Sequence, residues 1–108
     1  LDKCLFVFSK TNWDILAKKI LALPLAQANA RAFGRLMLSG AADADTDQQG
    51  RILIPDYLRA YADLGKQSVI AGIGDRIEIW NSAIWKQYKT KTESASDEIA
   101  EKMGELGI

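Results

Sequence analysis

The stretch Leu5-Phe6-Val7-Phe8, with Trp13 behind it, returns as Ile77-Glu78-Ile79-Trp80 with Trp85 behind it, an offset of 72 positions (from 5 to 77). In both copies an apolar, strand-like run ends in an aromatic residue and leads into a helix start. The start falls at Ser9 or Thr11 in the first copy and at Asn81 or Ser82 in the second. Such a repeat indicates one structural unit used twice, so we predict a fold of two pseudo-repeats.

A further unit precedes the second copy and reads Asp47-Gln48-Gln49-Gly50-Arg51-Ile52-Leu53-Ile54-Pro55. By the same offset, its counterpart in the first copy would fall about 22 residues before Leu1. We therefore expect that the chain is cut at its front, and the absence of an initiator methionine agrees with this expectation.

Length and composition narrow the class of protein. The 108 residues suffice for one small core, or for two half-domains that share one. The content of 48% hydrophobic and 26% charged residues is typical of soluble globular domains, and no apolar run approaches the ~18 residues of a membrane span. Cys4 is the only cysteine, which excludes an internal disulfide framework and agrees with a reducing cytoplasm. We expect a cytoplasmic protein with no membrane partner.

The composition gives little support to catalysis. The chain has no histidine, so the commonest metal ligand and the usual general base are both missing. The sequence also shows no candidate pair of nucleophile and base and no cofactor motif. We predict no enzyme, no cofactor and no small-molecule substrate. Because fourteen basic residues balance fourteen acidic ones, any DNA binding must come from local clustering of charge.

Hydrophobic periodicity predicts the elements of the first half of the chain. A buried strand is expected first, because its residues are continuously apolar, and two helices follow, the first of which Pro24 stops. After Gly40 the pattern changes to two strands joined by a turn. The expected ranges are a strand over 4–8, helices over 11–23 and 26–38, strands over 41–46 and 51–54, and the turn at 47–50.

The second half is predicted by the same signals. A short helix over 55–62 is followed by a hairpin over 67–73 and 76–80, because Gly74-Asp75 between apolar runs is a strong turn signal. Asn81 is expected to cap a helix to about residue 89. The remainder is interpreted as a polar linker over 90–96 and a short amphipathic helix with Ile99, Met103 and Leu106 on one stripe.

Alternating aspartates, Asp43, Asp45 and Asp47, resemble the start of a calcium loop. The match fails because the sixth position is Gln48 rather than glycine and the twelfth is Ile54 rather than glutamate. We interpret them as one face of a strand that leads into a turn. A metal-dependent nuclease that uses these carboxylates remains a rival hypothesis.

The pattern Asp47-x-x-x-Arg51 points to binding. Asp47 can accept a hydrogen bond from a backbone N–H two residues on, and Gly50 supplies the unusual backbone dihedrals that deliver Arg51 to the rim of a sheet. A guanidinium held there can pair with guanine or phosphate through two hydrogen bonds. The alternative is that Asp47 only forms the turn and that Arg51 pairs internally. From the residues alone this alternative is favoured.

The unit from Asp47 to Pro55, then Leu58-Arg59, then the run from Val69 to Trp80, closely resembles the second half of MraZ proteins, which belong to the AbrB-like, swapped-hairpin superfamily. The first half is similar to the same family in Phe8 to Trp13, Leu21-Ala22-Leu23-Pro24 and Phe33-Gly34-Arg35-Leu36-Met37-Leu38-Ser39-Gly40-Ala41-Ala42. The chain departs from the family in lacking the first copy of the Asp-x-x-x-Arg signature. It also has two glutamines where the first copy often has a basic residue.

The resemblance implies an α+β fold, a small β-barrel of two pseudo-repeats with peripheral helices. We divide the chain into the C-terminal part of the first repeat with a helical pair (1–42), the second repeat (43–89), and a linker with an amphipathic helix (90–108). The family's rings of identical subunits bind tandem repeats in double-stranded DNA, ahead of the division and cell-wall gene cluster, and regulate its transcription. A nucleoid-associated protein is therefore expected.

From these observations we predict a sequence-specific DNA-binding transcriptional regulator. Arg51 is the expected DNA contact, with Gln48 and Gln49 as further phosphate or base-edge contacts of lower weight, while Asp47 and Gly50 position the motif. Several copies in a ring would gain affinity by effective concentration, so multivalency replaces net charge. The rival is an oligomerisation module in which the first repeat carries DNA recognition.

Overall fold

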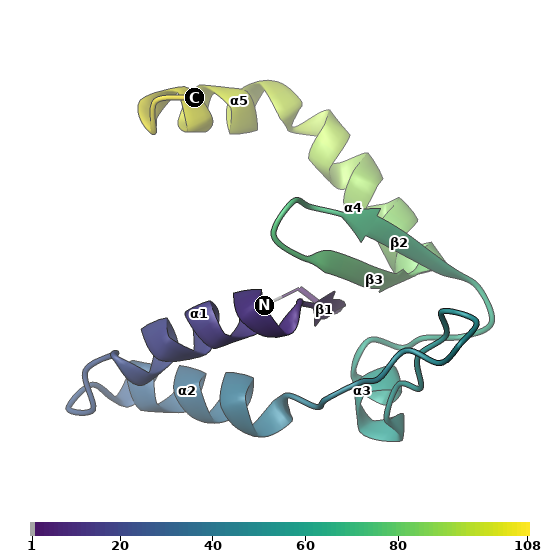
Figure 1. Ribbon diagram of the computed structural model, residues 1–108. Helices are drawn as coiled ribbons and strands as arrows, with labels where there is room; N and C mark the ends of the chain where they lie inside the picture. The colour runs from purple at the N-terminus through teal and green to yellow at the C-terminus, as the bar shows by residue number, and fades with distance from the viewer. Residues whose placement is uncertain (1) are drawn as a thin grey trace.

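The strands of the two repeated units pair with each other at the centre of the computed structural model, which describes residues 2–108 (Figure 1). β1 (Leu5–Val7) runs antiparallel to β3 (Ile77–Asn81), and β2 (Ser68–Gly72) pairs with the other edge of β3. The sheet order is therefore β1-β3-β2. The two repeats thus contribute to one sheet rather than forming two separate units.

A tight turn fixes the β2–β3 hairpin, as the sequence predicts. The N–H of Ile73 donates to the carbonyl of Arg76 over 2.9 Å, which leaves Gly74 and Asp75 as the two central residues. Gly74 has φ +102°, and a glycine with positive φ at the first central position is the mark of a type II′ turn. This turn is favoured because its twist matches that of the flanking strands.

The two helix starts of the repeat are capped in the same way, by a side-chain oxygen that accepts the backbone N–H three residues on. In α1 (Lys10–Leu21) the hydroxyl of Ser9 accepts the N–H of Asn12, and in α4 (Ser82–Ser94) the side chain of Asn81 accepts the N–H of Ile84. Each tryptophan of the repeat therefore lies four residues after its cap. Of the starts that the sequence left open, Ser9 rather than Thr11 caps the first helix, and the predicted cap at Asn81 is confirmed.

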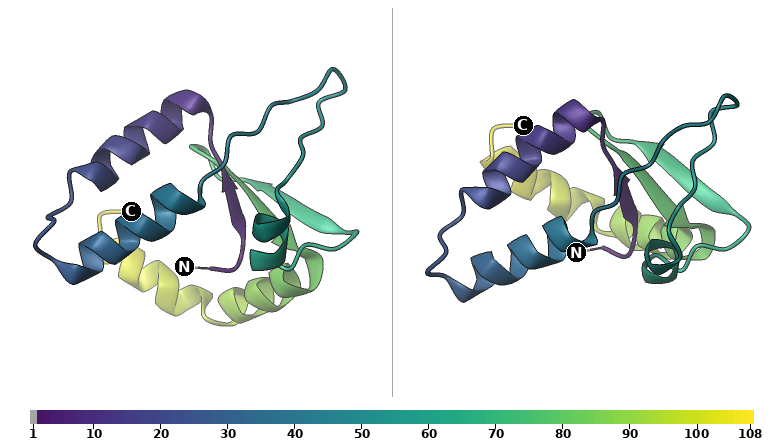
Figure 2. Two further views of the ribbon diagram at one scale, coloured as in Figure 1. Left: turned by 90° about the horizontal axis from the view of Figure 1, so that it is seen from below. Right: turned by 60° about the horizontal axis from the view of Figure 1, so that its bottom comes forward.

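An antiparallel helical hairpin follows β1. α1 and α2 (Ala28–Gly40) lie side by side (Figures 1 and 2), and they meet near Gly34, where a Cβ would make an ordinary van der Waals contact of 3.8 Å with a methyl of Ile20. Ile20 is buried between the two helices. Pro24 lies in the connection that separates the two helices.

The core lies between the sheet and α3 (Asp56–Tyr61). Leu5 and Ile79 are register partners, so their side chains share one face of the sheet, where they pack with the fully buried Ala62. Val7, Ile54, Leu58 and Leu64 surround this cluster. The opposite face carries Trp80, which packs against the α4 side chains Trp85, edge to face, and Tyr88, with ring centroids 5.3 and 5.0 Å away. α3 and α4 therefore cover opposite faces of the sheet.

The predicted closed barrel is wrong for residues 2–108, although the α+β class holds. The sheet has three strands and is open, because residues 41–46 and 51–54 form an extended arm rather than strands. A strand needs a neighbour for its backbone N–H and C=O groups. In residues 41–46 the only apolar side chains are alanines, which offer too little surface to hold such a neighbour.

The predicted linker over 90–96 is also wrong in its first part, because α4 continues to Ser94. No glycine or proline interrupts this segment, and Lys89 and Glu93, four residues apart, form an ion pair of 3.9 Å across it. The helix breaks only at Ala95, where φ is −108°, and α5 (Ser96–Glu105) then leads away from the sheet (Figure 1).

Candidate nucleic-acid interface

The turn that carries the Asp47-x-x-x-Arg51 motif forms at the tip of the extended arm (Figure 2). The N–H of Gly50 donates to the carbonyl of Asp47 over 3.0 Å, and the N–H of Asp47 donates to the carbonyl of Arg51 over 2.8 Å. Gly50 has φ +79°, a left-handed conformation that glycine adopts without a steric penalty. The predicted turn with its left-handed glycine is therefore present.

The carboxylate of Asp47 ties this turn together. One oxygen, Oδ1, accepts the backbone N–H groups of Gln49 at 2.9 Å and Arg51 at 2.8 Å, while Oδ2 accepts Nε–H of Arg51 at 3.0 Å. These donors stabilise the charged carboxylate. The backbone hydrogen bond from Arg51 is the largest cause that lowers the pKa of Asp47, and the hydrogen bonds from the Arg51 side chain and from Gln49 act in the same direction.

Arg51 pairs internally and still presents donors to solvent. Its side chain is 72% exposed, and Nε is the one guanidinium nitrogen bonded to Asp47. A guanidinium carries five N–H groups, four of them on the two terminal nitrogens. Within residues 2–108 those nitrogens have no hydrogen-bond partner, so they remain available to a ligand in an orientation that Asp47 fixes.

The other expected contacts, Gln48 and Gln49, are exposed in the same turn. Their side-chain amides make no hydrogen bond within the part of the chain that the structure describes. The turn thus collects every residue for which the sequence predicts a role in binding or positioning. Their contact with DNA stays a prediction.

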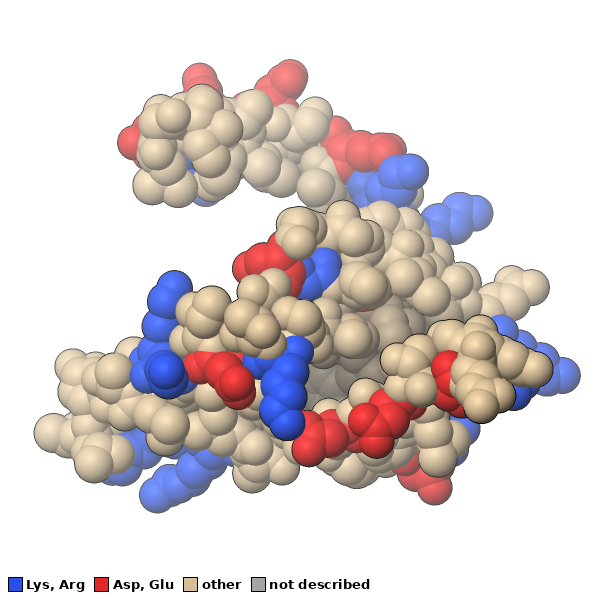
Figure 3. All heavy atoms as spheres, in the orientation of Figure 1, with Lys and Arg blue, Asp and Glu red and all other residues tan. Residues whose placement is uncertain are grey.

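Charge around the turn is mixed. Asp43 and Asp45 lie exposed on the same arm, and no group of three or more histidine, cysteine, aspartate or glutamate side chains among residues 2–108 is arranged to hold a metal ion. The face shown in Figure 3 has acidic and basic side chains interspersed over it rather than one continuous basic area. Binding of a polyanion would therefore depend on a few placed cations.

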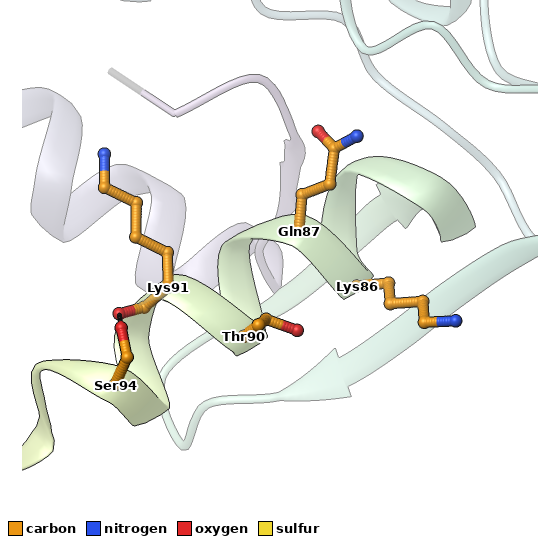
Figure 4. Close-up of a pocket in the computed structure, with 5 residues that line it drawn as sticks. All are labelled: Lys86, Gln87, Thr90, Lys91 and Ser94. Atoms are coloured by element: carbon orange, nitrogen blue, oxygen red, sulfur yellow. Dashed lines mark hydrogen bonds between the residues drawn. The ribbon is translucent and has the colours of Figure 1, made fainter.

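A shallow, open hollow lies along α4. Lys86, Gln87, Thr90, Lys91 and Ser94 line it, and Figure 4 shows their side chains spreading outward from the helix instead of converging. The hydroxyl of Ser94 bonds back to the carbonyl of Lys91 at 2.8 Å. In the region from residue 2 to residue 108, none of the helices combines the length and apolar character that a membrane crossing requires.

A partly buried ion pair that the sequence did not lead us to expect joins Glu78 of β3 to Arg76, the residue just before that strand. Glu78 is 7% exposed, and its Oε2 accepts Nε–H of Arg76 at 3.0 Å and lies 2.9 Å from Nη2 of the same guanidinium. Its Oε1 accepts Nε1–H of Trp80 at 3.1 Å. Burial alone would lower the pKa of Arg76, but Glu78 and then Asp75 outweigh it and raise that pKa. The signal in the sequence was the single charge of the strand run Ile77-Glu78-Ile79-Trp80.

Comparison with known proteins identifies similar chains over nearly the whole length. A family model described as "MraZ protein, putative antitoxin-like" matches residues 37–105. A protein of Carboxydothermus hydrogenoformans named "Transcriptional regulator MraZ" is 50% identical over 103 residues, which are 95% of this chain and 72% of that protein. Proteins of the same name from Alkaliphilus oremlandii and Desulfitobacterium hafniense are 47% and 46% identical over 108 residues, which are all of this chain and 76% of each relative.

Proposed function

The chain belongs to the MraZ family, and from this premise we propose that it is a transcriptional regulator that binds double-stranded DNA and has no catalytic activity. In this proposal it acts in the cytoplasm at the nucleoid, as a ring of identical subunits on tandem promoter repeats ahead of the division and cell-wall gene cluster. The names of the relatives support the regulatory role.

One observation carries the assignment of DNA contact to Arg51. Its guanidinium is anchored through Nε to Asp47 while its two terminal nitrogens face solvent at the tip of an arm. Two such nitrogens match the O6 and N7 acceptors of guanine or the oxygens of a phosphate. Because the anchor fixes the direction of the fork, less side-chain freedom is lost on binding. Gln48 and Gln49 lie beside it and are assigned as secondary contacts.

The experiment is a salt titration of binding to a tandem-repeat operator and to a scrambled duplex. If Arg51 reads a base, Arg51→Ala should weaken binding by about 1–3 kcal/mol, and if it binds the backbone, the salt slope should fall by about one for each phosphate that it neutralises. Arg51→Lys keeps the positive charge but loses the two parallel N–H donors of the guanidinium. Compared with Arg51→Ala, it should therefore have the salt slope of the wild type but not its preference for the operator over the scrambled duplex.

Arg59→Ala is the matched control. Arg59 is also exposed and also paired with an aspartate, Asp56, but it lies on α3 rather than on the turn. Its replacement should leave both affinity and slope unchanged. Arg51→Ala with wild-type affinity and slope would assign Asp47 and Arg51 to turn formation alone.

A second candidate function is an assembly module in which another copy of the motif, in the first repeat, recognises DNA. The charge of the arm favours this second function. Asp43, Asp45 and Asp47 precede Arg51 on the arm, and their negative charges repel the phosphate backbone of DNA. Under this function the variants at Arg51 leave DNA binding intact, while changes that disrupt assembly abolish it.

A further inference from the structure

α5 presents an apolar stripe that no other element covers. Ile99 and Met103 in α5 and Leu106 at its C-cap recur at positions i, i+4 and i+7, which places them on one side, and they are 40%, 37% and 73% exposed. α5 makes no extensive contact with another element, and Figures 1 and 3 show it standing away from the rest of the molecule. An isolated helix shorter than about 12–15 residues is marginal in water, so a covering surface would stabilise it.

α5 has a net negative charge, and its acidic residues are unevenly distributed around the helix. Glu98 and Glu105 are seven residues apart and so lie along one edge of the apolar stripe, whereas Asp97 and Glu101 lie on the opposite face. Lys102, the one cation of this helix, pairs with Glu98 at 3.6 Å. An acceptor surface for α5 must therefore combine exposed apolar side chains with positive charge.

The α1–α2 hairpin has both properties. It carries the cations Lys10, Lys18, Lys19, Arg31 and Arg35 against a single carboxylate, Asp14. Ile15 is 52% exposed and has Lys18 and Lys19 as its helical neighbours at i+3 and i+4. On α2, Leu36 is 56% exposed and Phe33 is 37% exposed. This surface is therefore opposite to α5 in charge and, like α5, exposes apolar side chains.

We propose that α5 of one copy docks on the α1–α2 hairpin of a second copy, with its apolar stripe against Ile15 and its Glu98 and Glu105 beside Lys18 and Lys19. The proposal deepens the ring assembly of the proposed function and rests on it. Within one chain the two surfaces are held apart, because α4 carries α5 away from the hairpin (Figure 1). Contact between different patches leaves one free surface of each kind, so further copies add until a ring closes.

Charge reversal with rescue tests this contact in the whole chain. Native mass spectrometry and sedimentation give the dissociation constant of the assembly. Glu98→Lys with Glu105→Lys, or Lys18→Glu with Lys19→Glu, should raise it by about tenfold or more, because each pair places like charges opposite each other. Combining all four changes in one chain should recover most of the assembly, which a variant that had merely lost the fold of α5 would not do.

Asp97→Lys with Glu101→Lys is the matched control, since it makes the same charge change on the uncovered face of the same helix and should leave the dissociation constant within about twofold of wild type. An equal loss in this control, or failure of the combined variant to recover, overturns the proposal. If the wild type assembles and the variants assemble equally well, this contact is wrong while the ring stands. A wild type that stays monomeric at micromolar concentration overturns both the contact and the ring. DNA binding is then still tested separately by the salt titration of the Arg51 variants.

Discussion

Phe6 and Glu78 are Cα partners across the β1–β3 ladder, and they are also each other's equivalents in the repeat, since 72 positions separate them (from 6 to 78). A local two-fold axis therefore passes between them. The two side chains at this axis differ both in type and in burial: Phe6 is 39% exposed and Glu78 is 7% exposed. Arg76 joins them, with its guanidinium carbon 4.6 Å from the Phe6 ring centroid and its nitrogens on the Glu78 carboxylate.

Removal of the Glu78 charge is predicted to destabilise the sheet. Glu78→Leu leaves the 27% exposed guanidinium of Arg76 and the indole N–H of Trp80 without their main acceptor, so the free energy of unfolding should fall by roughly 2–4 kcal/mol. Urea denaturation measures this change. Adding Arg76→Met should recover part of the loss, because the unpaired charge is then removed. A double variant as unstable as the sum of the two single variants would show that the pair is not coupled.

Trp13→Ala and Trp85→Ala test the equivalence of the two repeats. Both tryptophans are half-buried rather than buried, so we expect a loss of about 2–3 kcal/mol, below the range for large aromatic residues in cores. Trp85→Ala should cost more, because Trp85 packs against two aromatic rings, Trp80 and Tyr88, while Trp13 packs against one, Phe8, with ring centroids 5.9 Å apart. Unaltered melting temperatures for both variants would contradict the alignment of the repeats.

Gly50 and Gly74, which both have positive φ, should respond differently to the same change. Gly50→Ala and Gly74→Ala each force a side chain into a left-handed or related conformation, at about 1–2 kcal/mol of local strain. Gly74 closes the β2–β3 hairpin, so its variant should lower the melting temperature. Gly50 lies on the exposed arm, so its variant should change DNA affinity and leave the melting temperature nearly constant. Asn at either position is the control, because it tolerates positive φ better than Ala.

Cys4 is predicted to be unreactive. Burial, followed by the negative charges of Glu78 and Asp2, raises the pKa of Cys4 from 9.0 to about 11, although Arg76 opposes this rise. The thiolate fraction at pH 8 should therefore be about a hundredfold below that of a thiol with the ordinary pKa. Alkylation by iodoacetamide at pH 8, with and without urea, measures the difference. Equal alkylation rates with and without urea would contradict the predicted low reactivity of Cys4.

Acid should release the turn that holds Arg51. Because the folded-state pKa of Asp47 is lowered, its contribution to turn stability is fully present above the ordinary aspartate value of about 3.9 and is lost as pH falls through the lowered value. NMR of the Arg51 Nε–H should therefore show protection at neutral pH that disappears only in strong acid. Asp47→Asn, which cannot carry the charge, should show reduced protection at every pH.

Local signals in the sequence were enough to predict the hairpin, the caps and the turn. Gly74-Asp75, Asn81 and the spacing of Asp47 and Gly50 each act through backbone groups a few residues away, so no knowledge of the rest of the fold was required. The extended arm and the open sheet depend instead on which segments find a partner strand, and hydrophobic pattern does not contain this information. The pairing of Arg76 with Glu78 was missed for a similar reason, because it depends on burial by Phe6 from the distant first repeat.

The order of strands in the sheet also has a consequence for the speed of folding. β2 meets β3 across a two-residue turn, whereas β1 pairs with residues that are 70 to 74 positions away (from Val7 to Ile77 and from Leu5 to Ile79). A hairpin forms within about 1–10 μs, while a long-range pairing must first overcome the entropy of closing a large loop. β1 should therefore join the sheet late, after the transition state, so destabilising substitutions in β1 accelerate unfolding and leave the refolding rate nearly unchanged.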